Sequence, residues 1–398
     1  MSSGAALAPS VSGVRLEQLP PLALYVHIPW CVRKCPYCDF NSHQLRDKVP
    51  EKAYLDALMS DLEQALPQIW GRRVASVFFG GGTPSLFSAP AIDTLISEFR
   101  ARVPLAADCE ITLEANPGTA EADKFLGFRK AGVTRLSIGI QSFNPKHLGE
   151  LGRIHDHHQA RRAIEIARDC FDNVNLDLMY ALPDQTLDEA RADVEAAVDA
   201  DVAHLSFYHL TIEPNTHFHR HPPVLPDEDA SAAMQELITA TLARSGYAHY
   251  ETSAWARPGR ECRHNLNYWG FGDYLGIGAG AHSKLSFPDR ITRSVRWKQP
   301  KEYMERTAGG SPVQSSHEVG RADVVFEFMM NVLRLNEGFR VHSFPERTGL
   351  QIAVAEKALR EAEARGLIER SHERIAPSAL GQRFLNDLLQ LFLPVSSS

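Results

Sequence analysis

The sequence predicts an α/β fold, an incomplete (β/α)6 barrel of the TIM type followed by a small, mainly helical domain. Six short runs rich in β-branched and aromatic residues alternate with segments of helical periodicity, which is typical of a parallel sheet. Polar residues and glycines gather where these runs end, as they do at the active end of such barrels. Near the C-terminus, two helical segments precede a hairpin pattern, and this order resembles a winged helix.

The six predicted strands share short, apolar or alternating patterns. They are LALYVHI (22–28), VASVFF (74–79), EITLEA (110–115), RLSIGIQ (135–141), VNLDLMY (174–180) and HLSFYHL (204–210). Between the first two strands, Tyr54, Leu58 and Leu62 fall on one face at helical spacing. Six units are too few to close a barrel of this type, so we expect one side to stay open.

The composition predicts four regions. They are a disordered leader (1–20), the barrel (21–245), an extension and linker in which residues 247–259 could add a strand (246–314), and the winged-helix-like domain with helices at 322–335 and about 350–365 (315–398). The last region has no concentrated basic stripe. We therefore expect it to serve as a packing or lid domain rather than to bind DNA.

Charge and hydropathy exclude several classes of protein. The chain has 398 residues, of which 44% are hydrophobic, and its net charge is -7. This sign disfavours a surface that binds phosphate backbones, so we expect no nucleic-acid partner. No apolar run approaches the roughly 18 residues of a membrane span, and the first twenty residues do not read as a signal peptide. We expect a cytoplasmic protein.

Three of the six cysteines, Cys31, Cys35 and Cys38, lie within eight residues directly after the first predicted strand. A reducing compartment disfavours disulfides, and a disulfide would leave one of the three thiols unpaired. Three thiolates can hold three corners of a [4Fe–4S] cluster and leave one iron open to another ligand. The spacing therefore favours a cluster.

Zinc is the main alternative for the same three thiolates. It prefers four ligands in a structural site, and His43 is the nearest candidate for the fourth. Asp39 and His27 are weaker candidates. The spacing favours the cluster without excluding zinc.

The motif C-x3-C-x2-C, with Tyr37 before the third cysteine, resembles the radical S-adenosylmethionine (SAM) superfamily. In that superfamily the open iron binds the amino and carboxylate groups of SAM, so the resemblance implies a [4Fe–4S] cluster and SAM as cofactors. Further motifs extend it over residues 25–186, in the order FFGGGTPS, EANPG, GIQSF, LGRIHD and NLDLMYALPDQT. Together they resemble the oxygen-independent coproporphyrinogen III oxidase group.

Carried over motif by motif, the resemblance implies a set of SAM-binding residues. They are Tyr25, Tyr37, Gly81, Gly82, Thr83, Glu114, Gln141, Arg153 and Asp177. Their chemistry suits SAM, because glycines let the backbone approach a ligand, carboxylates bind hydroxyl or ammonium groups, and arginine pairs with a carboxylate. Each of these residues also has a structural explanation when it is considered alone. GGGTPS could form a tight turn, Glu114 or Asp177 could be a carboxylate at the end of the sheet, and Arg153 could form a surface ion pair.

Two departures point to a heme-chaperone branch of this group. The oxidases carry a fourth cysteine where this sequence has Phe40, and they have a longer ordered segment before the cluster motif than the thirty residues that precede Cys31 here. In addition, RHNLNYWG (263–270) matches the H-N-x-x-Y-W motif associated with heme in that branch. The resemblance makes His264 the expected axial heme ligand, with Tyr268 and Trp269 packed on the porphyrin.

Two further groups are predicted to play no part in this chemistry. Cys262 could ligate heme but is expected to be a buried thiol, and the histidines of HFHRH (217–221) are expected to lie in an exposed loop. We therefore expect a heme chaperone that binds heme and passes it to an acceptor protein, which could be membrane-associated. The alternatives are an enzyme that decarboxylates coproporphyrinogen III propionates, and a metal- or cluster-binding module without SAM chemistry.

Overall fold

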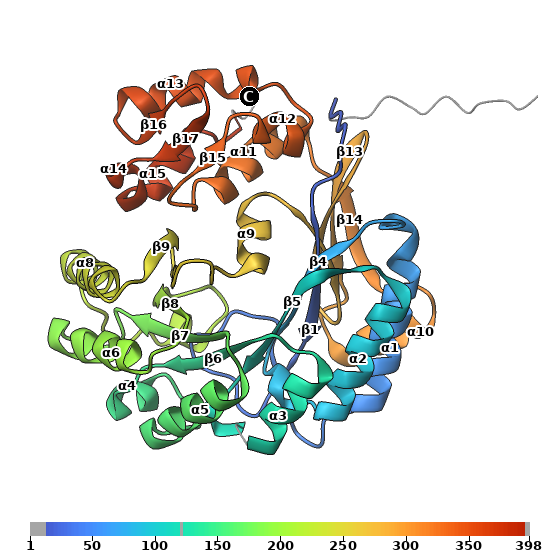
Figure 1. Cartoon of the computed structure of the whole chain (residues 1–398), viewed down its shortest axis with the longest axis vertical. Coiled ribbons are helices and arrows are strands. Elements are labelled where there is room, and N and C mark those ends of the chain that lie inside the picture. The colour runs from blue at the N-terminus through green and yellow to red at the C-terminus, as the bar shows by residue number, and fades with distance from the viewer. Residues whose placement is uncertain (1–12, 120–121, 395–398) are drawn as a thin grey trace, which may run out of the picture.

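The computed structural model describes residues 13–119 and 122–394 and shows a large mixed sheet (Figure 1). Its strand order is β14-β13-β12-β11-β1-β4-β5-β6-β7-β8-β10-β9. The six central strands are the predicted ones: β1 (Leu22–Ile28), β4 (Val74–Gly81), β5 (Leu105–Ala115), β6 (Arg135–Gln141), β7 (Val174–Tyr180) and β8 (His204–His209). They pair in parallel throughout, and the sheet curves without closing. The predicted incomplete barrel is confirmed.

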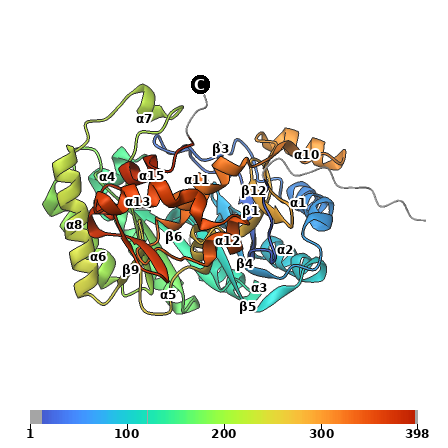
Figure 2. The same ribbon diagram turned by 90° about the horizontal axis from the view of Figure 1, so that it is seen from above.

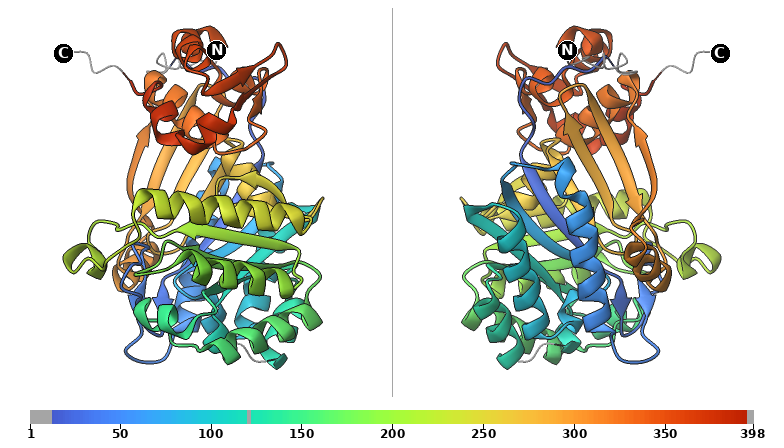
Figure 3. Two further views of the ribbon diagram at one scale, coloured as in Figure 1. Left: turned by 90° about the vertical axis from the view of Figure 1, so that its left-hand side faces the viewer. Right: turned by 90° about the vertical axis from the view of Figure 1, so that its right-hand side faces the viewer.

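Helices between consecutive strands cover the outer face of the barrel (Figures 1 and 3). They are α1 (Glu51–Ala65), α2 (Ala89–Arg102), α3 (Ala122–Ala131), α4 (Pro145–Glu150), α5 (His157–Cys170), α6 (Leu187–Asp199) and, after β8, α8 (Glu228–Arg244). Tyr54, Leu58 and Leu62 of α1 are fully buried, as their helical spacing predicts. Asp156 and Thr186 begin α5 and α6 with capping boxes.

The sheet continues beyond the barrel on both sides. At one end β11 (Asp273–Ile277) pairs in parallel with β1, and antiparallel strands β12 (His282–Phe287), β13 (Arg290–Arg296) and β14 (Val313–Glu318) follow. At the other end, β10 (Ala254–Ala256) and β9 (Ala248–Glu251) add two antiparallel strands where the sequence suggested one. Helix α10 (Pro300–Ala308) packs against α1.

The C-terminal region has two helices near the predicted ranges, followed by the predicted hairpin, but a short strand and a further helix lie between the two helices, and two more helices follow the hairpin. Its elements are α11 (Arg321–Val332), β15 (Phe339–Arg340), α12 (Ser343–Thr348), α13 (Glu356–Ala364), β16 (Ile368–Arg370), β17 (Arg374–Pro377), α14 (Ala379–Arg383) and α15 (Leu385–Gln390). The strands form a separate sheet in the order β15-β17-β16, and the region has its own hydrophobic core around Phe328. It lies above the barrel in Figure 1, and β13 and β14 extend towards it in Figure 3.

The leader predicted for residues 1–20 falls partly outside the described residues. From residue 13 on, the segment packs against the C-terminal region, with Val14 and Leu16 buried in its core. The Arg15 N–H donates a hydrogen bond to the carbonyl oxygen of Gly349 over 3.2 Å. This contact joins the N-terminal segment to the C-terminal region.

The remaining elements are short. They are β2 (Trp30–Cys31), β3 (His43–Gln44), α7 (His217–Arg220), α9 (Arg263–Trp269) and the 3-10 turns Leu66–Gln68, Pro84–Leu86, Pro117–Thr119 and Ile352–Ala355. The histidines at 217, 219 and 221 are exposed, as predicted, but the predicted loop is wrong, because Thr216 caps one helical turn there and Phe218 is buried beneath it. Within the described ranges, no helix is both long and apolar enough to cross a membrane.

Candidate functional site

The cysteine motif lies on a loop fixed at both ends. Strand β2 ends at Cys31 and pairs in parallel with β3, so that Trp30 lies opposite His43. Between these strands the Asn41 side-chain amide donates hydrogen bonds to the carbonyl oxygens of Ala279 and Lys298, each over 2.9 Å. The loop therefore has a defined place at the carboxyl end of β1. Seen from above in Figure 2, β3 and α7 lie along the same edge of the molecule.

A cavity of about 380 Å³ opens at the carboxyl ends of the parallel strands. All three motif cysteines line it, and each thiol is free and partly exposed. Eight of the predicted SAM-binding residues line it as well: Tyr37, Gly81, Gly82, Thr83, Glu114, Gln141, Arg153 and Asp177. Tyr25 is not among the lining residues. Its ring stacks on Phe78, and its hydroxyl lies 3.0 Å from Nδ1 of His27.

The thiols suit an iron–sulfur cluster. Burial raises the pKa of Cys31 to about 11 and also raises the pKa of Cys38, so these thiols ionise readily only beside a positive partner such as iron. Among the described residues, no three His, Cys, Asp or Glu side chains converge on one point, as a single zinc ion requires. A cubane cluster instead takes each thiolate on a different iron.

The turn after β4 brings bare backbone to the cavity. Gly81 has a φ of +114°, and a Cβ there would come within 2.6 Å of the His27 ring. A Cβ on Gly82 would lie 2.5 Å from the carbonyl oxygen of Trp30. The Gly82 and Thr83 N–H groups donate to the carbonyl oxygens of Ile28 and Trp30, each over 2.7 Å. The glycines are therefore required by close packing against β1 and the cysteine loop.

Two carboxylates form the acidic wall of the cavity. Glu114 accepts a hydrogen bond from the Gly81 N–H over 3.2 Å, while Asp177 accepts from the Ser137 hydroxyl over 2.8 Å and from the Asn175 amide over 2.9 Å. Burial, and then the nearby charge of Asp177, raise the pKa of Glu114 to about 8. Burial also raises the pKa of Asp177. Such a wall suits a ligand that carries cationic and hydroxyl groups.

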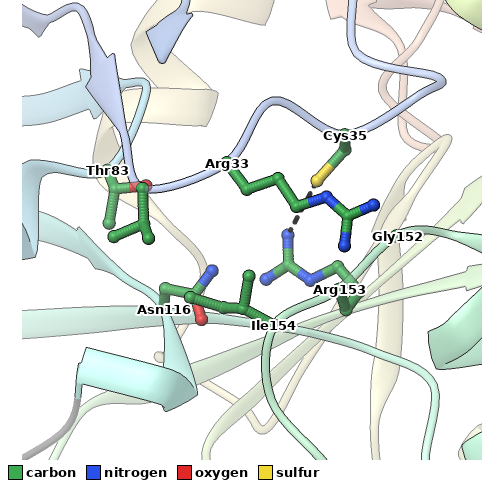
Figure 4. A pocket seen from close by; sticks show the side chains of 8 residues that line it. Arg33, Cys35, Thr83, Asn116, Gly152, Arg153 and Ile154 are labelled. Carbon is green, nitrogen blue, oxygen red and sulfur yellow. Dashed lines mark hydrogen bonds between the residues drawn. The ribbon is translucent and has the colours of Figure 1, made fainter. Parts of the chain in front are cut away.

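Arg153 lies beside Cys35 of the cysteine loop (Figure 4). Its Nη2 donates to the carbonyl oxygen of Gly139 over 2.7 Å, and its Nη1 lies 3.6 Å from Sγ of Cys35. Its Nε is buried without a hydrogen-bond partner. Arg153 has no carboxylate within ion-pair distance among the described residues, which contradicts the surface ion-pair alternative. Its guanidinium is available to an anionic group in the cavity.

Comparisons with known proteins agree with this geometry. The radical SAM superfamily model matches residues 25–197, and the HemN C-terminal domain model matches residues 319–384. The chain is 50% identical to the heme chaperone HemW of Escherichia coli (strain K12), over 95% of this chain and all of that protein. It is 32% identical to the HemW of Bacillus subtilis, over 93% of this chain and 98% of that protein.

The chain belongs to the HemW family. A solved structure of coproporphyrinogen III oxidase (HemN) from Escherichia coli, a radical SAM enzyme, shares its fold with a TM-score of 0.80. That structure is 25% identical and matches 94% of this chain and 90% of its own. The resemblance stated from the motifs is therefore confirmed at the level of family and fold.

Sequence reasoning missed several residues that line the cavity of this HemW-family chain. They include Arg33, Asn116, Ser137, Gly139, Met179, Tyr208 and His209. Ser137 and Gly139 precede Gln141 at every second position of β6, and Met179 follows Asp177 in the same way on β7. Strand alternation alone could have found these three residues. Phe40, which is 63% exposed, lies at the rim.

In this HemW-family chain, His264 lies away from the cavity. It belongs to α9, and its Nδ1 is 3.2 Å from the hydroxyl of Ser76, near the amino end of β4. Its ring packs against Phe78 with centroids 4.8 Å apart. Burial, and then the charge of Arg135, lower the pKa of His264 to about 4, so the imidazole is neutral at pH 7. A neutral imidazole is the form that binds iron.

The other residues of the α9 motif pack against the protein. The Arg334 guanidinium lies 4.3 Å from the centre of the Trp269 ring, and the Tyr268 ring lies 5.1 Å from that of Tyr274. Cys262, at the N-terminal end of α9, is a buried free thiol, as expected. The aromatic side chains therefore have protein partners in this structure.

Proposed function

We propose that this chain is a heme chaperone that binds heme and transfers it to an acceptor protein. The observation that carries the proposal is its likeness, over nearly its whole length, to relatives named heme chaperone HemW. The absence of a cysteine at Phe40, where the oxidases resembled by its motifs have one, supports this assignment over the oxidase. The acceptor could be a membrane-associated heme protein, and the free cysteines suit a cytoplasmic setting.

The cavity is proposed to hold the two cofactors that the family implies. Cys31, Cys35 and Cys38 would each bind one iron of a [4Fe–4S] cluster, which supplies a one-electron reductant next to SAM. Glu114 and Asp177 would receive the cationic and hydroxyl groups of SAM. Arg153, whose Nε has no hydrogen-bond partner among the described residues, would bind the carboxylate group of SAM. Tyr37 would close the cavity from the cysteine loop.

His264 is proposed to be the axial ligand of heme. The hydrogen bond between its Nδ1 and Ser76 orients the ring and leaves Nε2 as the ligand atom. Because Tyr268 and Trp269 pack against Tyr274 and Arg334, porphyrin binding would exchange part of these contacts for contacts with the ligand. The heme site would therefore lie at α9 and the SAM site at the opposite end of the strands.

One preparation tests the proposal against its alternatives. Anaerobically reconstituted protein is titrated with hemin, and in parallel it is incubated with coproporphyrinogen III, SAM and a reductant. We expect one heme per chain and no protoporphyrinogen. Turnover of coproporphyrinogen would overturn the proposal in favour of the oxidase. Cluster absorbance without binding of SAM or heme would overturn it in favour of a cluster module.

A further inference from the structure

A continuous chain of hydrogen bonds crosses the barrel interior from the cavity to α9. Asn175 Nδ2 donates to Asp177 over 2.9 Å, and Asn175 Oδ1 lies 2.6 Å from Nδ1 of His204. Nε2 of His204 lies 2.9 Å from the Tyr250 hydroxyl. That hydroxyl in turn accepts from the Cys262 N–H over 3.4 Å and from the Asn265 amide over 3.5 Å. We call these contacts the interior relay.

The donors of the interior relay all point the same way. Because Asn175 Oδ1 only accepts, Nδ1 of His204 carries the proton. Burial, and then the charge of Arg135, hold the pKa of His204 well below its usual range, so Nε2 is bare and accepts from the Tyr250 hydroxyl. Each donor thus faces towards Asp177, and the relay ends on a carboxylate that lines the cavity.

The groups of the relay have little freedom to adopt another arrangement. Asn175 is 2% exposed and His204 is fully buried. The Ser206 hydroxyl also donates to Asn175 Oδ1, over 3.1 Å, and the second hydrogen of the Asn175 amide is bound to the Ser137 hydroxyl over 2.7 Å. A shift of Asp177 therefore displaces its partners, because in a packed interior hydrogen-bonded groups move together.

We propose that the interior relay couples ligand binding at Asp177 to the position of α9, so that SAM in the cavity and heme at α9 favour each other's binding. The part of this inference that concerns heme rests on the proposed function. The coupling between Asp177 and α9 does not. A ligand that holds Asp177 ionised and fixed strengthens the charge-assisted hydrogen bond from Asn175, and each following donor gains from the one before it. The last of these bonds anchor the N-terminal part of α9.

Helix α9 also has an anchor that is independent of the relay. Glu110 accepts hydrogen bonds from the N–H groups of Arg263 and His264 over 3.1 and 3.4 Å, and the Arg263 side chain pairs with Asp108 over 2.6 Å. Interrupting the relay should therefore loosen α9 without removing it. This separation makes the coupling testable by substitution.

The first test uses Tyr250→Phe, which removes the hydroxyl that joins His204 to α9 and keeps the ring. The matched control is Tyr247→Phe, which removes a buried hydroxyl that donates to the Val202 carbonyl over 2.7 Å, outside the relay. Hydrogen exchange of residues 262–270 is measured in reconstituted protein with and without saturating SAM. We expect SAM to slow this exchange by about fivefold or more in the wild type and the control, and by less than half that factor in Tyr250→Phe.

Equal protection by SAM in all three proteins, or none in the wild type, would overturn the coupling. Asn265→Ala, which removes one of the two hydrogen bonds from α9 to the Tyr250 hydroxyl, is a second variant in case Tyr250→Phe does not fold, and it should reduce the protection in the same direction. The heme arm measures hemin affinity with and without SAM, and SAM affinity with and without hemin. Because binding linkage is reciprocal, the two titrations should give the same factor, about fivefold or more, and a factor of one would overturn the heme arm. Protection by SAM in a protein that binds no heme would leave the relay supported and the proposed function refuted.

Discussion

The carboxylate of Glu114 accepts a hydrogen bond from the backbone N–H of Gly81, over 3.2 Å, at the carboxyl ends of the adjacent strands β5 and β4. This one contact ties the acidic wall of the cavity to the glycine turn that packs on the cysteine loop. The buried Glu114 carboxylate faces a ligand site, and within the described ranges its one backbone donor is the Gly81 N–H. Glu114 is therefore the residue at which ligand binding and protonation should be most closely linked.

The pH dependence of stability should reveal this buried carboxyl group. Its pKa of about 8 in the folded, ligand-free protein lies above its usual value. The unfolded chain therefore releases this proton at a lower pH than the folded protein does, and a rise in pH favours unfolding. Between about pH 5 and about pH 8, the wild type should lose up to about 1.4 kcal/mol per pH unit relative to Glu114→Gln, and above that range the difference should level off. Urea unfolding of both proteins, with their cysteines kept reduced, measures this difference in the free energy of unfolding.

Asp93→Asn, at an exposed position of α2, serves as the control for the loss of a carboxylate outside the cavity. Parallel curves for wild type and Glu114→Gln would show that the carboxyl group titrates normally. Asp177 remains in both proteins, but its charge acts on Glu114, so the difference reports the titration of the coupled pair of carboxyl groups.

The cluster ligands are tested by removing one thiol at a time. Cys31→Ala, Cys35→Ala and Cys38→Ala should each lose the brown absorbance of the cluster and most of the bound iron after anaerobic reconstitution, because a cubane held by two thiolates is exposed and labile. Cys109→Ala, which removes a partly buried thiol of β5, should retain both. Iron analysis and visible absorbance give the answer. Full iron content in any of the three variants would exclude that cysteine as a ligand.

The sequence was most informative where a pattern is local. The six barrel strands, the helix face of Tyr54 and the cysteine spacing depend on residues close together in the chain, and the structure contains each of them. Strand β11 was missed because its short run DYLGI becomes a strand only by pairing with β1, with Leu22 opposite Asp273. Such long-range pairing has no local signature.

The same limit applies to the site. The motif residues that line the cavity could be named because their order along the chain resembles a family. The interior relay could not be predicted, because Asn175, His204 and Tyr250 are isolated polar residues in three different strands. Their contacts depend on long-range strand pairing, which places Asn175 opposite His204. Sequence reasoning also gave no position for His264 relative to the cavity.

The glycine turn predicts an asymmetry between two substitutions of the same kind. Gly82→Ala would place a methyl group 2.5 Å from the Trp30 carbonyl oxygen, so the turn and the cysteine loop must separate. We expect a loss of stability of about 1–3 kcal/mol and SAM binding weakened by roughly tenfold or more. Gly149→Ala, where no atom lies within 4 Å of the added methyl group, is the matched control. Equilibrium dialysis with SAM and thermal unfolding measure both effects, and unchanged SAM affinity in Gly82→Ala would show that the turn is not part of the ligand site.

The proposed heme ligand can be separated from the other sixteen histidines of the chain by a pair of substitutions. His264→Ala removes the imidazole whose Nδ1 is held by Ser76, and it should weaken hemin binding by roughly tenfold or more and change the Soret band, because the iron loses its protein ligand. His372→Ala, at a side chain that is 90% exposed, should bind hemin as the wild type does. Ser76→Ala keeps the imidazole but frees its orientation, so it should fall between the two. If His264→Ala retains the wild-type spectrum and affinity, the iron is bound elsewhere, and the aromatic residues of α9 then serve only the packing seen with Tyr274 and Arg334.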